Sequence, residues 1–81
     1  MKAIIHVIKQ SLFVVYTNEN VKIQRGVRFG HERCGVKYYF CTRKGVDKVT
    51  NNDHSKCKII GIHRNPTVKE MDQTIKDYFK N

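Results

Sequence analysis

Two short stretches of this chain carry residue types that bind metal ions. Residues 31–35 read HERCG and residues 54–57 read HSKC, so each places a histidine three positions before a cysteine. Zn²⁺ binds thiolate and imidazole in a tetrahedron, and two ligands separated by two residues can both reach it from one tight turn. The spacing therefore predicts a zinc site formed by the two pairs, His31, Cys34, His54 and Cys57.

The neighbouring residues leave a second interpretation of these pairs open. Gly30 and Gly35 flank the first pair, nineteen residues separate the pairs as in a zinc ribbon, and Cys41 or His63 could replace one ligand. Zinc ribbons, however, usually carry CxxC at both ends. A chain with four His and three Cys also contains some such spacings by chance. In the alternative, the cysteines are small buried hydrophobic residues and the histidines lie in exposed loops.

The net charge is the second feature with a chemical consequence. Sixteen Lys and Arg stand against seven Asp and Glu, which gives a formal net charge of +9 at pH 7. A charge this large on 81 residues creates a positive field that attracts polyanions, and nucleic acid is the commonest of these. An acidic protein partner would respond to the same field.

Cations alternate with aromatic residues on one face of the predicted sheet. Cations neutralise phosphates and release counterions, and an exposed tyrosine stacks a base for about 1–3 kcal/mol. The candidate nucleic-acid-binding residues are Lys22, Arg28, Lys37, Tyr39, Arg43, Lys44, Lys48 and Lys58. In the alternative interpretation Tyr39 packs in the sheet and the lysines form an ordinary solvated surface.

Catalytic motifs are not recognisable in the chain. Ser11 and Ser55 are the only serines and lack a placed His–Asp pair, and no phosphate loop or dinucleotide glycine motif is present. A small ribonuclease built on His54 and His63 with nearby cations is the one enzymatic alternative. We expect a non-enzymatic nucleic-acid-binding protein. The alternative is an inhibitor or adaptor that binds a host protein, of the kind found in phages or mobile elements, since the codons for Lys, Asn, Ile and Tyr are AT-rich.

The apolar residues predict a β-sheet. Nine Val and eight Ile stand against one Leu and one Ala, and β-branched residues favour pleated surfaces. We expect strands over residues 3–9, 12–17, 21–29, 36–43 and 57–63, with a turn at 43–45 and a weaker strand at 46–50. The first two are apolar on both faces and are expected in the middle of the sheet.

The C-terminal residues predict a helix. Thr67 and Glu70 have the spacing of a capping box, and an apolar stripe follows at helical spacing. The stripe consists of Val68, Met71, Ile75 and Tyr78 or Phe79. The expected fold is therefore α+β: a small antiparallel sheet of about five strands with one C-terminal amphipathic helix packed on it.

Length and cysteine usage set the remaining expectations. An 81-residue chain is expected to form one domain, residues 1–81, with a thin core that gains stability from a metal, a partner or a homodimer contact. No signal-peptide pattern and no apolar run of roughly 20 residues is present. Together with an odd number of cysteines, this favours a cytoplasmic protein, in the host-cell cytoplasm if viral. The expected partners are nucleic acid, a host protein or a second copy, and not a membrane.

Overall fold

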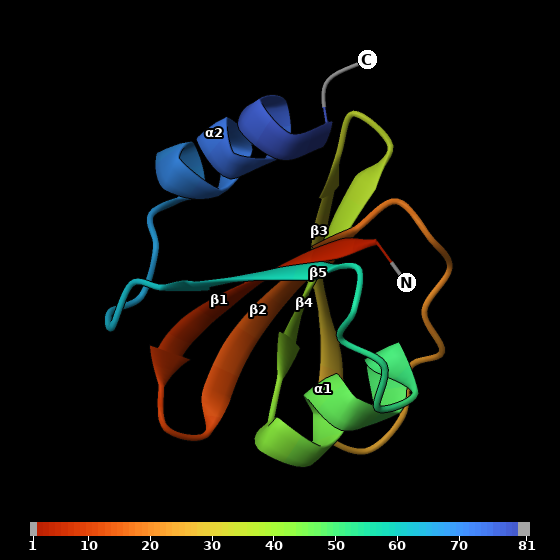
Figure 1. The fold of residues 1–81 in the computed structure, drawn as a ribbon. Helices are drawn as coiled ribbons and strands as arrows, with labels where there is room; N and C mark the ends of the chain where they lie inside the picture. Colours follow the sequence, from red (N-terminus) through yellow and green to blue (C-terminus); the bar gives the residue numbers. More distant parts are fainter. Residues whose placement is uncertain (1, 80–81) are drawn as a thin grey trace.

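The computed structural model describes residues 2–79, which form a five-stranded sheet with one helix on each face (Figure 1). In chain order the elements are β1 (Ala3–Lys9), β2 (Leu12–Thr17), β3 (Val27–Arg33), β4 (Val36–Cys41), α1 (Arg43–Thr50), β5 (Cys57–Gly61) and α2 (Val68–Phe79). The strands lie in the order β3-β4-β2-β1-β5. β5 runs parallel to β1, and the other neighbouring strands pair antiparallel.

The predicted α+β class, with five strands and a C-terminal helix, is confirmed. The sheet is mixed rather than wholly antiparallel because α1 carries the chain from β4 past β2 and β1 before β5 begins. A parallel neighbour needs such a crossover, which short hairpin turns cannot provide.

The strand predicted at 46–50 and the turn at 43–45 are wrong, because residues 43–50 form helix α1. Thr42 is the N-cap, and its hydroxyl accepts a hydrogen bond from the Gly45 amide at 3.0 Å. Val46 and Val49 are β-branched, which suggested a strand. Their spacing of three also places them on one helix face, where they pack against the sheet.

β3 begins six residues later than predicted. The Val27 amide donates to the Gln24 carbonyl at 2.9 Å, and Gly26 has a φ of +88°, as the third position of a type II turn requires. Residues 21–24 therefore run outside the sheet. The strand instead continues to Arg33, and Cys34 and Gly35, both with positive φ, turn it into β4.

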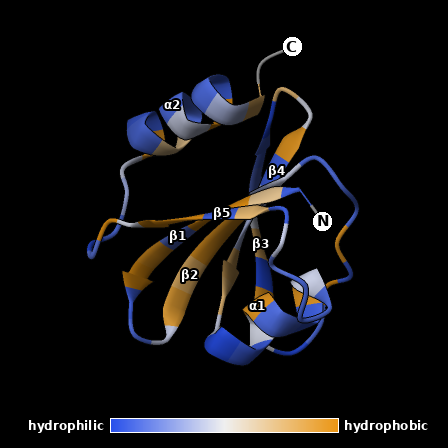
Figure 2. Cartoon of the chain, in the orientation of Figure 1, coloured by the Kyte–Doolittle hydropathy of each residue, from blue (hydrophilic) through white to orange (hydrophobic). Residues whose placement is uncertain are grey.

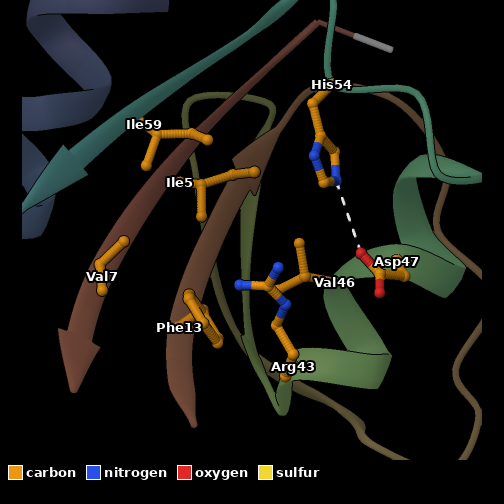
Figure 3. A pocket seen from close by; sticks show the side chains of 8 residues that line it. All are labelled: Ile5, Val7, Phe13, Arg43, Val46, Asp47, His54 and Ile59. Atoms are coloured by element: carbon orange, nitrogen blue, oxygen red, sulfur yellow. Dashed lines mark ion pairs between the residues drawn. The ribbon is translucent and has the colours of Figure 1, made fainter. Parts of the chain in front are cut away.

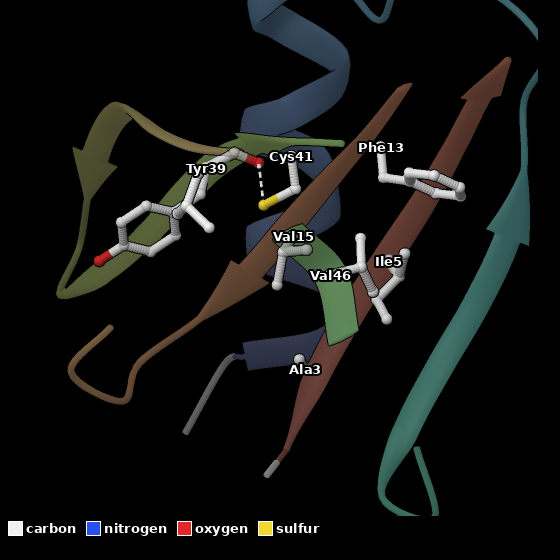
Figure 4. Packing of buried hydrophobic residues seen from close by; sticks show 8 residues of the cluster. Ala3, Ile5, Phe13, Val15, Tyr39, Cys41 and Val46 are labelled. Atoms are coloured by element: carbon white, nitrogen blue, oxygen red, sulfur yellow. Dashed lines mark hydrogen bonds between the residues drawn. The ribbon is translucent and has the colours of Figure 1, made fainter. Parts of the chain in front are cut away.

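Both faces of the sheet are covered by apolar packing. Odd-numbered residues of β1 and β2 face α1 and even-numbered ones mostly face α2, as strand alternation dictates. The α1 face holds Ala3, Ile5, Phe13, Val15, Val27, Tyr39, Cys41 and Val46 (Figure 4). The α2 face holds Ile4, Ile8, Val14, Tyr16, Val36, Tyr38, Met71 and Ile75. β1 and β2 are correspondingly apolar along most of their length (Figure 2). The sheet face on which cations and aromatic residues were expected to alternate is therefore not open, because α1 packs on it.

The predicted capping box starts α2. The Glu70 amide donates to the Thr67 hydroxyl, and the Thr67 amide donates to the Glu70 carboxylate, both at 3.1 Å. Hydrogen bonds from the Arg64 guanidinium and from Thr67 lower the pKa of Glu70 to about 2. The stripe that follows this cap packs Met71 and Ile75 onto the sheet.

A polar pair is buried under α2. Tyr16 Oη lies 2.8 Å from His6 Nδ1, and the two residues are 0 % and 5 % exposed. Burial lowers the pKa of His6 below its ordinary value of 6.5, although the Glu70 charge acts in the opposite direction. His6 is therefore neutral in the folded protein at pH 7.

We expect the free energy of unfolding to decrease as the pH falls below 6.5, the ordinary pKa of histidine. In that range the unfolded chain binds a proton at His6 and the folded chain does not, until the pH reaches the lowered pKa of the folded state. Urea denaturation at several pH values between 7 and 5 measures this decrease in the free energy of unfolding. Glu70 and Asp72 have lowered pKa values, so they change protonation below this pH range. The His6→Gln variant should lack the loss; an unchanged slope in that variant would contradict this origin.

Candidate functional site

A cluster of cations lies where the turn at residues 24–27 meets the start of α1. Arg25, Lys44 and Lys48, together with Gly26 and Thr42, line a hollow of about 510 Å³. The cations come from segments far apart in the sequence, one from the turn and two from the helix. The fold therefore creates a local concentration of positive charge that the sequence does not show.

Two glycines allow the turn and the helix to approach closely. The Thr42 amide donates to the Gly26 carbonyl at 2.9 Å, and a Cβ on Gly45 would overlap that same carbonyl oxygen. A Cβ on Gly26 would lie 2.7 Å from Thr42 Oγ1. Lys48 Nζ donates to the Arg25 carbonyl at 3.1 Å, which adds a side-chain contact to the same junction. The relative positions of the cations are thus fixed by backbone contacts.

A second hollow, of about 290 Å³, shares Gly26 and Thr42 with the first. Its lining adds Arg28 from β3 and Phe40 from β4, and the Arg28 guanidinium carbon lies 5.5 Å from the centre of the Phe40 ring. The two hollows therefore adjoin at Gly26 and Thr42, with Phe40 and Arg28 on the α2 face of the sheet and Lys44 and Lys48 on helix α1. We call Arg25, Arg28, Lys44 and Lys48 the basic surface.

Within residues 2–79 none of the four cations of the basic surface forms an ion pair. The first turn of α1 contains no acidic residue, and Lys44 and Lys48 are like charges four residues apart on one helix. Both features disfavour the helix by a few tenths of a kcal/mol each. The ion pairs among the described residues involve other cations: Arg33–Asp72, Arg64–Glu70 and, when the histidine is protonated, His54–Asp47. An anion bound at the basic surface would offset this repulsion.

Three of the predicted nucleic-acid-binding residues, Arg28, Lys44 and Lys48, belong to the basic surface. Arg43 is on the same helix but lines a different, mainly apolar cavity with Asp47 and His54 (Figure 3). His54 Nε2 lies 3.7 Å from Asp47 Oδ1 in that cavity, which is an ion pair only when the imidazole is protonated.

The remaining predicted cations lie apart from the basic surface. Lys22 is exposed in the segment before the turn at 24–27. Lys37 lies at the far end of β4, opposite Glu32 on β3. Lys58 is on the outer strand β5, with Nζ 4.8 Å from the centre of the Tyr78 ring. The predicted set is therefore spread over several surfaces.

The prediction that Tyr39 is an exposed stacking residue is wrong. Tyr39 is 2 % exposed and packs in the α1-face cluster with Val15 and Cys41 (Figure 4). The aromatic residue beside the cations is its neighbour Phe40, which points to the opposite face because adjacent strand residues alternate. Phe40 is only partly buried.

Arg25 is the member of the basic surface that sequence reasoning missed. In the sequence it interrupts an alternating apolar row and precedes Gly26. The glycine was the available signal, since a glycine at a break in the alternation can supply the positive φ of a turn.

The two HxxC pairs do not form one metal site. His31 and Cys34 belong to the β3–β4 hairpin at one edge of the sheet, whereas His54 and Cys57 flank or begin β5 at the other edge. At least three strand-to-strand spacings of about 4.8 Å lie between the two pairs, so the pairs are on the order of 15 Å apart. Among residues 2–79 no group of three or more His, Cys, Asp or Glu is arranged to hold a metal ion. The nineteen intervening residues contain a strand and a helix, not one hairpin.

Cys41 and Cys57 also have environments that disfavour the thiolate form. Burial raises the pKa of Cys41 to about 12, and burial is the main cause that raises the pKa of Cys57. Cys41, 1 % exposed, packs as a small hydrophobic residue of the core. Cys34, in contrast, is exposed at the hairpin turn.

The histidines of the ribonuclease alternative are likewise separated. His54 precedes β5 and His63 follows it, so an extended strand of about 3.3 Å per residue lies between them. His54 instead faces Asp47 on α1. The two imidazoles therefore cannot act on one phosphate in this arrangement.

Comparisons with protein-family models, curated proteins and solved structures give no significant match to this chain. Neither helix within residues 2–79 has the length and apolar character needed to cross a membrane.

Proposed function

We propose that this chain is a non-enzymatic nucleic-acid-binding protein that holds the phosphate backbone on the basic surface. The observation that supports the proposal most is the convergence of Arg25, Arg28, Lys44 and Lys48 from a turn, a strand and a helix around two joined hollows. Within the described residues none of the four forms an ion pair. Such unpaired like charges disfavour folding unless an anion binds them.

The start of α1 contributes to the same positive potential. The helix begins at Arg43, and the partial positive charge of its first turn adds to Lys44 and Arg25 beside it. The net charge of +9 then attracts a polyanion from a distance, while the hollows provide the contact. Phosphates repeated along a strand fit several cations spaced over one surface better than a single small anion does.

The first test is binding of labelled single-stranded oligonucleotides, measured by fluorescence anisotropy at 50 and 200 mM salt. Three or four phosphate contacts predict an affinity loss of roughly 20–50-fold between these salt concentrations. We expect the double variant Lys44→Gln/Lys48→Gln to bind more weakly and to show a shallower salt dependence, by about 1.4 in the logarithmic slope, because two phosphate contacts are removed.

The matched control is Lys69→Gln/Lys76→Gln on α2, which lowers the net charge equally at two exposed positions away from the basic surface. The proposal requires the control to retain most of the affinity. Equal losses of affinity in both double variants would show that binding depends on the overall charge and not on the basic surface. If the unchanged protein does not bind at 50 mM salt, the proposed function is rejected.

Binding to a protein partner is a second candidate function, favoured by the outer strand β5. Ile59 is 57 % exposed there and lines the mainly apolar cavity of about 110 Å³ beside Ile5 and Phe13 (Figure 3). An outer strand offers unpaired backbone groups to an added strand of another protein or of a second copy. Native mass spectrometry of nuclease-treated protein tests this candidate, and Ile59→Lys should abolish any dimer or complex detected.

A further inference from the structure

The hollow beside Arg28 and Phe40 differs in chemistry from the one beside Lys44 and Lys48. The first is lined largely by apolar groups, including Leu12 and Val27, with one aromatic ring and one guanidinium group. The second has no apolar side chain in its lining, which consists of three cationic residues, Thr42 and Gly26. A ligand that occupies both must therefore combine a flat apolar group with a charged one.

The Phe40 ring is held in place although it is partly exposed. A Cβ on Gly30 would lie 2.9 Å from Phe40 Cε2 and 2.8 Å from the Tyr38 ring, so both rings pack against the bare backbone of β3. The Tyr38 and Phe40 rings meet edge to face, with their centres 6.2 Å apart. Arg28 lies over the same Phe40 ring. A fixed ring loses little conformational freedom when a ligand stacks on it.

We propose that this hollow binds an unpaired nucleobase of a single strand whose phosphates lie on Arg25, Lys44 and Lys48. This inference rests on the proposed function. Gly26 and Thr42 line both hollows, so a strand that passes over these two residues can place a base in one hollow and its phosphates at the other. Aromatic rings and arginine guanidinium planes both stack on bases, and such stacking tolerates any base.

The same geometry selects single strands over duplexes. In a duplex the faces of the bases are covered by their neighbours, so a base reaches the Phe40 ring only if it leaves the stack. Phosphate contacts to Arg25, Lys44 and Lys48 make no such distinction. We therefore expect the preference for single strands to depend on Phe40 and the general affinity to depend on the lysines.

The test compares oligo-dT with an abasic strand of the same length and charge, at 50 mM salt. We expect the unchanged protein to bind oligo-dT roughly tenfold or more tightly than the abasic strand. Equal affinities would overturn the base site and leave the proposed function intact. No binding of either strand would reject the proposed function itself, so the two failures are distinguishable.

The variant Phe40→Leu tests whether the base stacks on the Phe40 ring. We expect it to lower the oligo-dT affinity to near that of the abasic strand and to leave the abasic affinity unchanged. Phe29→Leu is the matched control, because Phe29 is an aromatic residue of β3, 47 % exposed, that contacts Tyr39 on the other face. Full oligo-dT affinity in Phe40→Leu would overturn the proposal. If that variant does not fold, 2-aminopurine in the strand serves as the probe: quenching of its fluorescence by the unchanged protein supports stacking, and no quenching overturns it.

Discussion

Gly45→Ala is expected to lower the free energy of unfolding by about 2–4 kcal/mol, although alanine is the better helix former. Helix propensity alone predicts that this change stabilises α1 by roughly 0.5–1 kcal/mol. The added Cβ, however, would overlap the Gly26 carbonyl oxygen, which is backbone and cannot rotate away. The turn at 24–27 must then separate from the helix, and the hydrogen bond from the Thr42 amide to Gly26 is strained or lost.

Gly35→Ala is the matched control for this prediction. Gly35 has a positive φ of +79°, unlike the helical Gly45, but a Cβ there meets nothing within 4 Å. Its cost is the backbone conformation alone, about 1 kcal/mol. Urea denaturation of both variants at pH 7 separates the two effects. A Gly45→Ala protein as stable as Gly35→Ala, or more stable, would show that the turn and α1 do not pack as described.

The same variant links stability to the proposed function. Arg25 is carried by the turn, whereas Lys44 and Lys48 are carried by the helix. If Gly45→Ala displaces the turn, oligonucleotide affinity should fall even at temperatures where the protein remains folded. The Gly35→Ala protein should bind normally, because its hairpin turn lies at the other end of β3 and β4.

The parts of the fold that were predicted correctly are those specified by local pattern. β1 and β2 are short apolar runs joined by a tight turn, and α2 has a capping box and an apolar stripe in its own sequence. Helix α1 has weaker local signals, since Thr42 caps Gly45 without a glutamate to complete a capping box, and the helix also depends on non-local contacts with Gly26 and with the sheet. The parallel pairing of β5 with β1 follows from that unpredicted helix.

The candidate site was predictable in its residue types and not in its position. Net charge alone indicates a polyanion partner, and three of the four cations were named. Their position depends on two features that no periodicity reveals: the turn ending at Val27, and the covering of both sheet faces by helices. These features put Tyr39 inside the core and leave Phe40 beside the cations.

The zinc prediction failed for a related reason. Spacing within one HxxC pair is a local property, and each pair does lie at a strand end or turn. Bringing two pairs together is a property of topology. Here the strand order places the hairpin at one edge and β5 at the other.

Ile75→Ala is expected to destabilise the protein by about 2–5 kcal/mol, the range for truncating a buried isoleucine. Ile75 is 4 % exposed and packs in the α2-face cluster with Met71, Tyr16 and Tyr38. The exposed ion pair Arg33–Asp72 adds little, because solvent screens it. Apolar packing is therefore what holds α2 on the sheet. For a domain of this size the expected decrease in Tm is roughly 10–30 °C.

The neighbouring Lys76 provides the control, since it is exposed on the same helix and Lys76→Ala should change Tm by no more than a few degrees. Thermal denaturation followed by circular dichroism measures both variants.

Loss of α2 packing also gives water access to the buried His6–Tyr16 pair. The Ile75→Ala protein should therefore depend less on pH between 7 and 5 than the unchanged protein, because its His6 accepts a proton more readily in the folded state. If the Ile75→Ala protein keeps both the Tm and the pH dependence of the unchanged protein, α2 does not cover this face of the sheet.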